Sequence, residues 1–141
     1  MRKNYNKLII IIVVIGVFVY AGPTLIGRAF GLRAYIFKSD DMVPVIKNGD
    51  KVILYKKAYK HNSPFVDDIV GLILPEDRNK IYIRRITQQS ANNTYYVSAE
   101  NKNSKDSREW GFIPKSNIVG KVVLVYAGYR CTYNKLKYKY K

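Results

Sequence analysis

An uncharged, strongly apolar run near the N-terminus constrains this chain more than any other feature. Residues 8–27 contain no charged side chain, and the stretch up to Tyr20 is almost entirely Ile, Val, Leu and Phe. Twenty helical residues extend about 30 Å, which matches the hydrocarbon core of a bilayer. Because a backbone in lipid must satisfy its own hydrogen bonds, we expect this β-branched run to be helical. The sequence therefore predicts one transmembrane helix over residues 8–27.

The flanks of this segment predict its orientation. Residues 1–7 are basic, and the positive-inside rule places such a flank in the cytoplasm. A cleaved signal peptide is the alternative, since it has the same basic start and apolar centre. The small residues Ala21 and Gly22 would offer a cleavage site, but Pro23 follows directly, where proline is unfavourable. We therefore expect an uncleaved, single-pass anchor in the plasma membrane, with the rest of the chain outside the cytoplasm.

The chain beyond the apolar run has the pattern of strands. Short apolar or alternating segments are separated by Asn, Gly, Pro and Asp, and no amphipathic helix of three turns interrupts them. We expect a mostly β domain over residues 28–128, a compact antiparallel β-barrel or pair of sheets. The tail, residues 129–141, alternates aromatic and basic residues and is expected to fray or lie on a surface. The expected strands are 34–37, 50–55, 69–74, 81–86, 94–97 and 118–126.

The charge of the chain favours anionic partners. The sequence has 25 Lys and Arg against 10 Asp and Glu, a net charge of +15. Such a chain attracts anionic partners, including lipid head groups, anionic surface polymers and nucleic acid. A domain outside the cytoplasm would not meet nucleic acid, so none is expected. Membrane lipid is an expected partner, and anionic surface polymers stay open.

Cysteine and histidine are too scarce for several kinds of site. Cys131 is the only cysteine, which rules out an internal disulfide and leaves no metal-site spacing. His61 is the only histidine and lies in a polar stretch, where a solvated loop residue is favoured over a triad or zinc site. We expect no metal and no cofactor.

Several ordered motifs in the β region resemble those of a known family. The most specific is Ser-Lys-Asp-Ser-Arg-Glu-Trp-Gly at 104–111, followed by Phe-Ile-Pro. Before it lie Ser-Asp-Asp-Met-Val-Pro at 39–44, Gly-Asp-Lys-Val at 49–52, Asp-Asp-Ile-Val at 67–70 and Tyr-Ile-Arg-Arg-Ile at 82–86. The order resembles that of bacterial type I signal peptidases, membrane-bound Ser-Lys proteases that remove signal peptides. The resemblance implies a signal-peptidase-like fold, with signal peptides or exported preproteins as partners.

Both positions that carry the family's catalysis hold other residues. Asp41 stands where the nucleophilic serine is expected, and Arg84 where the general-base lysine is expected. Burial can bring a lysine near neutrality, but removing a proton from arginine at pH 7 would cost roughly 7 kcal/mol. A carboxylate that attacked a peptide bond would form a mixed anhydride, and no group would be present to protonate the leaving amine. Lys80 lies about 13 Å along the strand from Arg84, too far to substitute. We therefore expect no peptidase activity.

Ser39 is the alternative nucleophile. The resemblance implies that its hydroxyl helps hold the oxyanion, and in an extended segment it would face the same side as Asp41. An active signal peptidase would then use Ser39 or another residue, although a base would still be missing. An aspartic-protease pair fails, because the neighbours Asp40 and Asp41 would point to opposite faces.

The resemblance implies that these two positions are in contact, and the opposite charges of Asp41 and Arg84 then favour a bidentate ion pair where the family has its dyad. Two unrelated substitutions are the alternative. The resemblance implies that Ser104 bonds the residue in the base position and that Asp106 pairs with two arginines, here Arg85 and Arg108.

Peptide binding is expected along the strand that contains Met42 and Pro44, since the family adds substrate as a β-strand; Met42 is equally interpreted as a core residue. The sequence thus predicts a membrane-anchored, non-catalytic relative that still binds peptides. The alternatives are an active peptidase and a basic surface protein that binds polyanions.

Overall fold

The computed structural model describes residues 2–127 and 130–131 of the chain. The chain divides into two compact units, Met1–Leu32 and Arg33–Lys141. The prediction for the tail lies outside the described residues except at Arg130–Cys131, where the chain forms a short strand.

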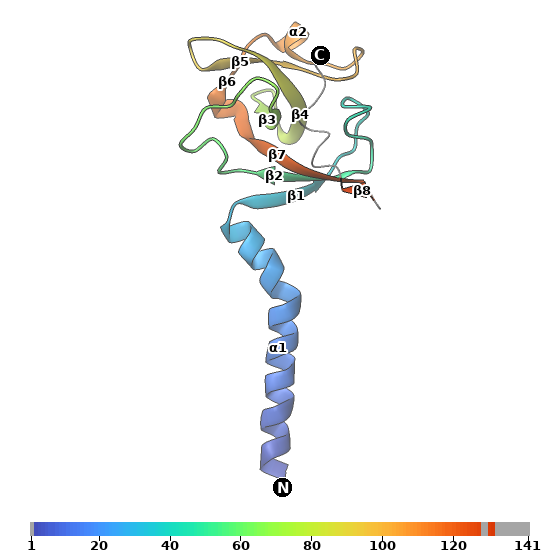
Figure 1. The fold of residues 1–141 in the computed structure, drawn as a ribbon, viewed down its shortest axis with the longest axis vertical. Coiled ribbons are helices and arrows are strands. Elements are labelled where there is room, and N and C mark those ends of the chain that lie inside the picture. Colours follow the sequence, from blue (N-terminus) through green and yellow to red (C-terminus); the bar gives the residue numbers. More distant parts are fainter. Residues whose placement is uncertain (1, 128–129, 132–141) are drawn as a thin grey trace. The chain divides into compact units, whose positions relative to one another are not determined.

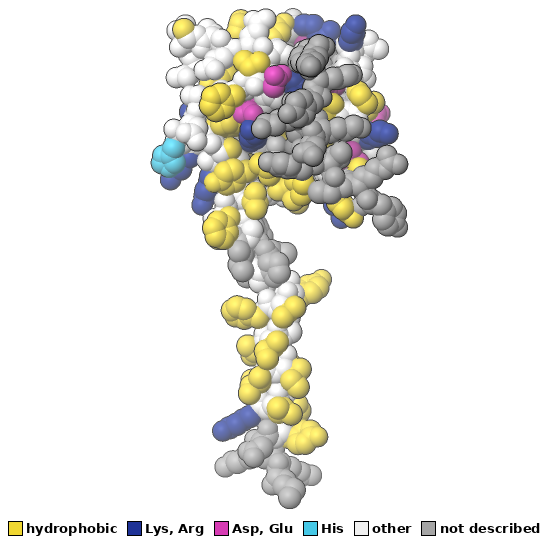
Figure 2. Space-filling view, in the orientation of Figure 1, with side chains coloured by type: hydrophobic (Ala, Val, Ile, Leu, Met, Phe, Trp, Pro, Cys, Tyr) yellow, Lys and Arg dark blue, Asp and Glu magenta, His cyan; other side chains and the backbone are white. Residues whose placement is uncertain are grey.

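The N-terminal unit is dominated by one helix, α1 (Arg2–Ala29). Its segment Tyr5–Gly22 is long and apolar enough to cross a membrane, and none of it is buried inside the protein. Figure 2 shows hydrophobic side chains projecting from this helix with no protein over them. One N-terminal apolar helix is therefore confirmed. It begins earlier than expected, because the basic flank continues the helix without a break.

The second unit contains the predicted strands with small shifts at their ends, except the one expected over residues 81–86, which extends over Asp77–Gln89. The short elements α2 (Ser107–Trp110), β6 (Ile113–Pro114), a 3₁₀ turn (Lys115–Asn117) and β8 (Arg130–Cys131) were not expected from the sequence. Only four residues, 90–93, connect β4 to β5. The remaining strands are β1 (Leu32–Ile36), β2 (Lys51–Tyr55), β3 (Ile69–Leu74), β4 (Asp77–Gln89), β5 (Thr94–Ser98) and β7 (Ile118–Ala127).

These strands form one sheet in the order β1-β2-β7-β3-β4-β5-β6, with β8 paired to β7. The long strand β7 lies between β2 and β3 and pairs antiparallel with both (Figure 1). The prediction of a mostly antiparallel β domain after one apolar helix is confirmed. The sheet is not closed into the expected barrel: over the described residues β1 and β6 end the order, and two-residue β6 offers little edge for closure.

Two apolar clusters form the core of the domain. Alternation along the strands divides the side chains between them, so that in β4 Ile83 joins one cluster and Ile86 the other. Phe37 and Met42 anchor the segment after β1 in the first cluster, and Trp110 packs against the second. The site described below is therefore built from one strand, β4, and two loops fixed by buried neighbours.

Close approach of β2 and β7 also holds this half of the sheet. A Cβ atom on Gly120 of β7 would lie 2.6 Å from the carbonyl oxygen of Tyr55. Because that neighbour is backbone, which cannot rotate away, only glycine fits at this crossing.

Candidate functional site

A buried ion pair joins the turn after β1 to the centre of β4. Asp41 opens the turn, and Arg84 pairs with Val70 in the β3–β4 ladder. The Nη2 atom of Arg84 donates to Oδ2 of Asp41 at 3.0 Å. The side chain of Arg84 is 1% exposed and that of Asp41 is 24% exposed. The ion pair expected from the sequence is therefore present.

The predicted bidentate geometry is wrong, because Arg84 directs most of its donors to backbone carbonyls. Its Nε and Nη2 atoms donate to the carbonyl oxygen of Lys105 at 2.9 and 2.6 Å, and Nη1 donates to that of Ile83 at 2.7 Å. Every nitrogen of the guanidinium thus donates a hydrogen bond, and Arg84 offers no lone pair that could accept a proton.

Two aromatic rings in contact with each other lie beside the buried guanidinium. Cζ of Arg84 lies 5.4 Å from the ring centroid of Trp110 and 5.7 Å from that of Tyr82. The two rings meet edge to face, with centroids 5.2 Å apart. These distances are within the range of cation–π attraction, which favours a charged over a neutral side chain at this position.

The carboxylate of Asp41 uses its second oxygen on a different loop. Oγ of Ser104 donates to Oδ1 at 2.7 Å, and the backbone N–H of Asn101 donates to the carbonyl oxygen of Asp41 at 2.9 Å. With the bond from Arg84 to Lys105, these contacts tie residues 101–105 to both members of the ion pair. The resemblance implied that Ser104 bonds the residue in the base position. In the structure its hydroxyl is bound to Asp41.

Ser39 faces the same pocket as Asp41, as expected, although the backbone that joins them is a bend and turn and not an extended segment. Residues 41–45 form a turn, and the backbone N–H of Asp41 donates to Oγ of Ser39 at 3.3 Å. Among the described residues, no nitrogen base is hydrogen-bonded to this hydroxyl. The turn therefore gives Ser39 a role in holding the backbone of Asp41.

The surroundings of the pair shift both pKa values. Burial would raise the pKa of Asp41, but hydrogen bonds from Ser104 and Ser39 and the charge of Arg84 together lower it below its ordinary value. Burial lowers the pKa of Arg84, while the charge and hydrogen bond of Asp41 oppose that change. Near neutral pH we therefore treat Asp41 as a carboxylate and Arg84 as a guanidinium.

Asp106 and its partners support the loop behind the pair. Asp106 is buried, and its Oδ1 atom caps α2 by accepting a hydrogen bond from the backbone N–H of Arg108 at 2.9 Å. The same oxygen accepts a hydrogen bond from Nε of Arg108 at 2.8 Å. Burial would raise the pKa of Asp106, and these bonds bring it below its ordinary value. Arg85, expected beside Asp106, forms its ion pair with Glu100 at 2.7 Å. Glu100 was not selected from the sequence.

The expected peptide-binding residues divide between core and surface. Met42 is fully buried in the first apolar cluster, so its side chain presents no surface to a ligand, whereas Pro44 is exposed. His61 is exposed. Among the described residues, no group of three or more His, Cys, Asp or Glu side chains could hold a metal ion.

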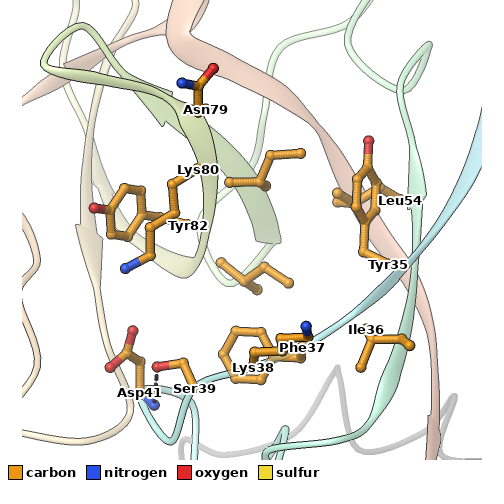
Figure 3. Close-up of a pocket in the computed structure, with 12 residues that line it drawn as sticks. Tyr35, Ile36, Phe37, Lys38, Ser39, Asp41, Leu54, Asn79, Lys80 and Tyr82 are labelled. Atoms are coloured by element: carbon orange, nitrogen blue, oxygen red, sulfur yellow. Dashed lines mark hydrogen bonds between the residues drawn. The ribbon is translucent and has the colours of Figure 1, made fainter.

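A pocket of about 350 Å³ lies beside the ion pair, between the segment after β1 and the first half of β4 (Figure 3). Ser39 and Asp41 line one side of it, and Lys80 extends from β4 toward that side. Sequence reasoning dismissed Lys80 as a base and did not select Lys38 or Tyr82, because no local pattern shows that these residues meet at one cavity.

Comparison with known proteins identifies the family. The sequence profile of the family described as signal peptidase, peptidase S26, matches residues 3–88 and 87–127. The chain belongs to this signal peptidase family. The match includes most of the apolar helix α1, the ion pair and the loop that ends at α2, and the peptidases of the family are serine endopeptidases.

Curated relatives carry signal peptidase names. The chain is 26% identical over 140 residues to a probable signal peptidase I-1 of Synechocystis sp., an alignment that covers 68% of this chain and 71% of the relative. A signal peptidase I of Buchnera aphidicola is 36% identical over 36% of this chain and 18% of its own length. A signal peptidase I of Aquifex aeolicus is 52% identical over 23% of this chain and 13% of its own length. The last two alignments cover short portions of much longer proteins.

Proposed function

We propose that this chain is a membrane-anchored member of the signal peptidase family that binds peptides without cleaving them. The observation that carries the proposal is the Asp41–Arg84 ion pair, at the two positions that match the nucleophile and base of the family's motifs. In this proposal, one replacement was accommodated by the other, since their charges compensate each other inside the domain.

The chemistry of the pair supports a lack of peptidase activity. A serine–lysine dyad needs a neutral amine that accepts a proton from the hydroxyl. Arg84 donates from all three of its nitrogens and lies beside two aromatic rings that favour its charged form. The oxygens of Asp41 already accept bonds from Arg84 and Ser104. Neither group is poised to attack a carbonyl or to protonate a leaving amine.

Signal peptides and exported preproteins are the partners that the family assignment supports. The peptidases of the family act on exported preproteins with signal peptides. We propose that this chain meets the same class of partner in the pocket beside Asp41, where the apolar side chains of Phe37, Leu54 and Ile81 face a ligand-sized space.

Membrane anchoring through α1 is supported by the helix and by the family. We propose a single-pass arrangement in the plasma membrane, with the basic N-terminus in the cytoplasm and the β domain outside it. This arrangement would bring the pocket to the side of the membrane where exported chains emerge.

An active peptidase that uses Ser39 is the second candidate. The observation in its favour is that Ser39 and Lys80 line the same pocket. Against it, the hydroxyl of Ser39 already accepts the backbone N–H of Asp41, and Lys80 is exposed, with its Nζ atom 4.6 Å from the ring centroid of Tyr82.

A cleavage assay separates the two candidates. The purified full chain in detergent is incubated with a preprotein that carries an Ala-x-Ala site, and the products are measured by mass spectrometry. We expect no product from the natural chain, and product from the double variant Asp41→Ser/Arg84→Lys, because the two positions are already in contact. Cleavage by the natural chain that disappears in Ser39→Ala would overturn the proposal in favour of the second candidate.

A further inference from the structure

A second pocket, of about 320 Å³, is formed by β4, β5 and the loop that leads from β5 into α2 (Figure 1). No described residue lines both this pocket and the one beside Asp41. Of the described residues in its lining, only Ala99 is apolar. Charged side chains lose hydration beside an apolar ligand, so this lining suits a small polar ligand and does not suit an apolar peptide.

An irregularity in the β4–β5 ladder helps to build the polar pocket. Arg85 and Ser98 are direct partners in this ladder, so their side chains lie on one face of the sheet. The register then shifts, and Thr87 is the residue of β4 that has no partner in β5. Its hydroxyl donates to the carbonyl oxygen of Tyr96 at 3.2 Å. Bulges re-aim side chains and are frequent beside active sites, and this one brings Thr87 to the same pocket as Arg85 and Ser98.

The charges of the polar pocket favour an anionic group. Its charged side chains are three cations and two carboxylates, Arg85, Lys102, Arg108, Glu100 and Asp106. Lys102 is exposed and forms no ion pair with any residue that the structure describes. Arg108 is half-exposed and donates from its backbone N–H, Nε and Nη2, so among the described residues its Nη1 atom has no acceptor. The pocket therefore has one cation in excess and two cationic groups that can donate to a ligand.

The polar pocket also contains hydrogen-bond acceptors. The hydroxyls of Thr87 and Ser98 donate their protons to a backbone carbonyl and to Asp106, so they offer lone pairs to a ligand. Among the described residues, Glu100 accepts only at Oε1, from Nε of Arg85 at 2.7 Å, which makes its Oε2 atom a further acceptor. These oxygens would repel a bare anion and would accept hydrogen bonds from ligand hydroxyl groups. The pocket thus fits a ligand that combines an anionic group with hydroxyls.

We propose that the polar pocket binds a phosphorylated polyol, a compound such as glycerol 3-phosphate in which a phosphate and hydroxyl groups lie a few atoms apart. Lys102 and Arg108 bind the phosphate oxygens through charge-assisted hydrogen bonds, and Thr87, Ser98 and Glu100 accept the hydroxyls of the polyol. Free phosphate esters, lipid head groups and anionic surface polymers can all present this chemistry. The inference is independent of the proposed peptide binding, because it concerns a separate pocket.

The test compares three ligands on the full chain in uncharged detergent micelles by isothermal titration calorimetry: glycerol 3-phosphate, inorganic phosphate and glycerol. We expect glycerol 3-phosphate to bind about tenfold more tightly than inorganic phosphate, the ratio for one or two added hydrogen bonds, and glycerol to show no binding. Lys102→Gln should weaken glycerol 3-phosphate about tenfold through the loss of a charge-assisted bond. The matched variant Lys105→Gln removes an exposed lysine of the same loop that does not line the pocket, and its affinity should equal that of the natural chain.

A second variant tests the acceptors. Thr87→Val keeps a β-branched side chain in the strand and removes the hydroxyl. It should weaken glycerol 3-phosphate and leave the binding of inorganic phosphate unchanged, which would show that Thr87 contacts the polyol. Thermal unfolding of each variant checks that the domain stays folded.

Three results would overturn the inference. Inorganic phosphate that binds as tightly as glycerol 3-phosphate would refute recognition of the polyol. Equal weakening by Lys102→Gln and Lys105→Gln would show general attraction to a basic loop and would refute the pocket. No binding of either phosphate compound would refute the site altogether.

The source of the ligand is tested with the chain in nanodiscs of phosphatidylcholine, with and without phosphatidylglycerol. If phosphatidylglycerol abolishes the binding of added glycerol 3-phosphate, the lipid head group occupies the pocket. If binding persists, the ligand is a soluble or polymer-borne ester. Either result agrees with a site for phosphorylated polyols.

Discussion

Arg84 and Asp41 lie 43 residues apart in the chain, and their side chains meet at 3.0 Å between Nη2 and Oδ2. The contact joins a strand at the centre of the sheet to the turn that follows β1. The same guanidinium holds the carbonyl oxygen of Lys105, so one side chain fixes two loops at once. Much of the local architecture therefore depends on a single buried charge and its compensation.

A double-mutant cycle should detect strong coupling between these two residues. Arg84→Ala or Asp41→Ala alone leaves an uncompensated charge in a largely buried place, and each should cost about 3 kcal/mol of unfolding free energy. The double variant should cost less than the sum of the two, since it removes both charges. Urea unfolding of the full chain in detergent, followed through the fluorescence of Trp110, measures all four proteins. Strictly additive losses would show that the two side chains are energetically independent.

The contribution of Asp41 should disappear in acid. Its pKa is lowered in the folded protein, so its stabilising contribution is complete above the unfolded pKa of about 3.9 and is lost as the pH falls through the lower, folded pKa. The difference in unfolding free energy between the natural chain and Asp41→Asn should therefore be largest above about pH 5. It should shrink steadily toward pH 2. A difference that stays constant over this range would mean that Asp41 is not the titrating group.

Asp106 should contribute more to stability than the neighbouring exposed ion pair. Asp106 is 1% exposed and accepts from Ala99 and Arg108, so Asp106→Asn places an amide NH₂ among donors and should cost about 2 kcal/mol. The matched change Glu109→Gln removes an exposed partner of Lys105 and should cost under about 0.5 kcal/mol. Thermal unfolding of both variants gives the comparison. Equal effects would refute the structural role assigned to Asp106.

Topology can be tested through the C-terminal tail. If α1 crosses the membrane with the N-terminus in the cytoplasm, a protease added to intact spheroplasts should remove epitopes from residues 129–141. An epitope placed before Arg2 should stay protected until the cells are lysed, which serves as the internal control. Protection of the tail together with digestion of the N-terminal epitope would reverse the proposed orientation.

Several features follow from the sequence by itself, because each depends on neighbours along the chain. The uncharged run before Arg28 is long enough for a membrane helix whatever follows it, and alternation within each strand separates its two faces. The Asp-Ser-Arg-Glu-Trp-Gly segment at 106–111 indicated the family, and the opposite charges at two motif positions predicted the ion pair. The ion pair differs from the other inferences, because it was expected only from the contact that the family resemblance implies between two positions 43 residues apart.

The tertiary structure alone decided how the charged groups share their partners. Sequence reasoning predicted a fork of Arg84 on Asp41 and a pair between Arg85 and Asp106. The loop of residues 99–106 instead brings the Lys105 carbonyl to Arg84 and Glu100 to Arg85. Backbone carbonyls are present at every residue, so the sequence carries no signal for which one a guanidinium will find. The open sheet and the pocket lined by Lys80 could not be predicted for a similar reason. Both depend on long-range strand pairing, which local periodicity does not specify.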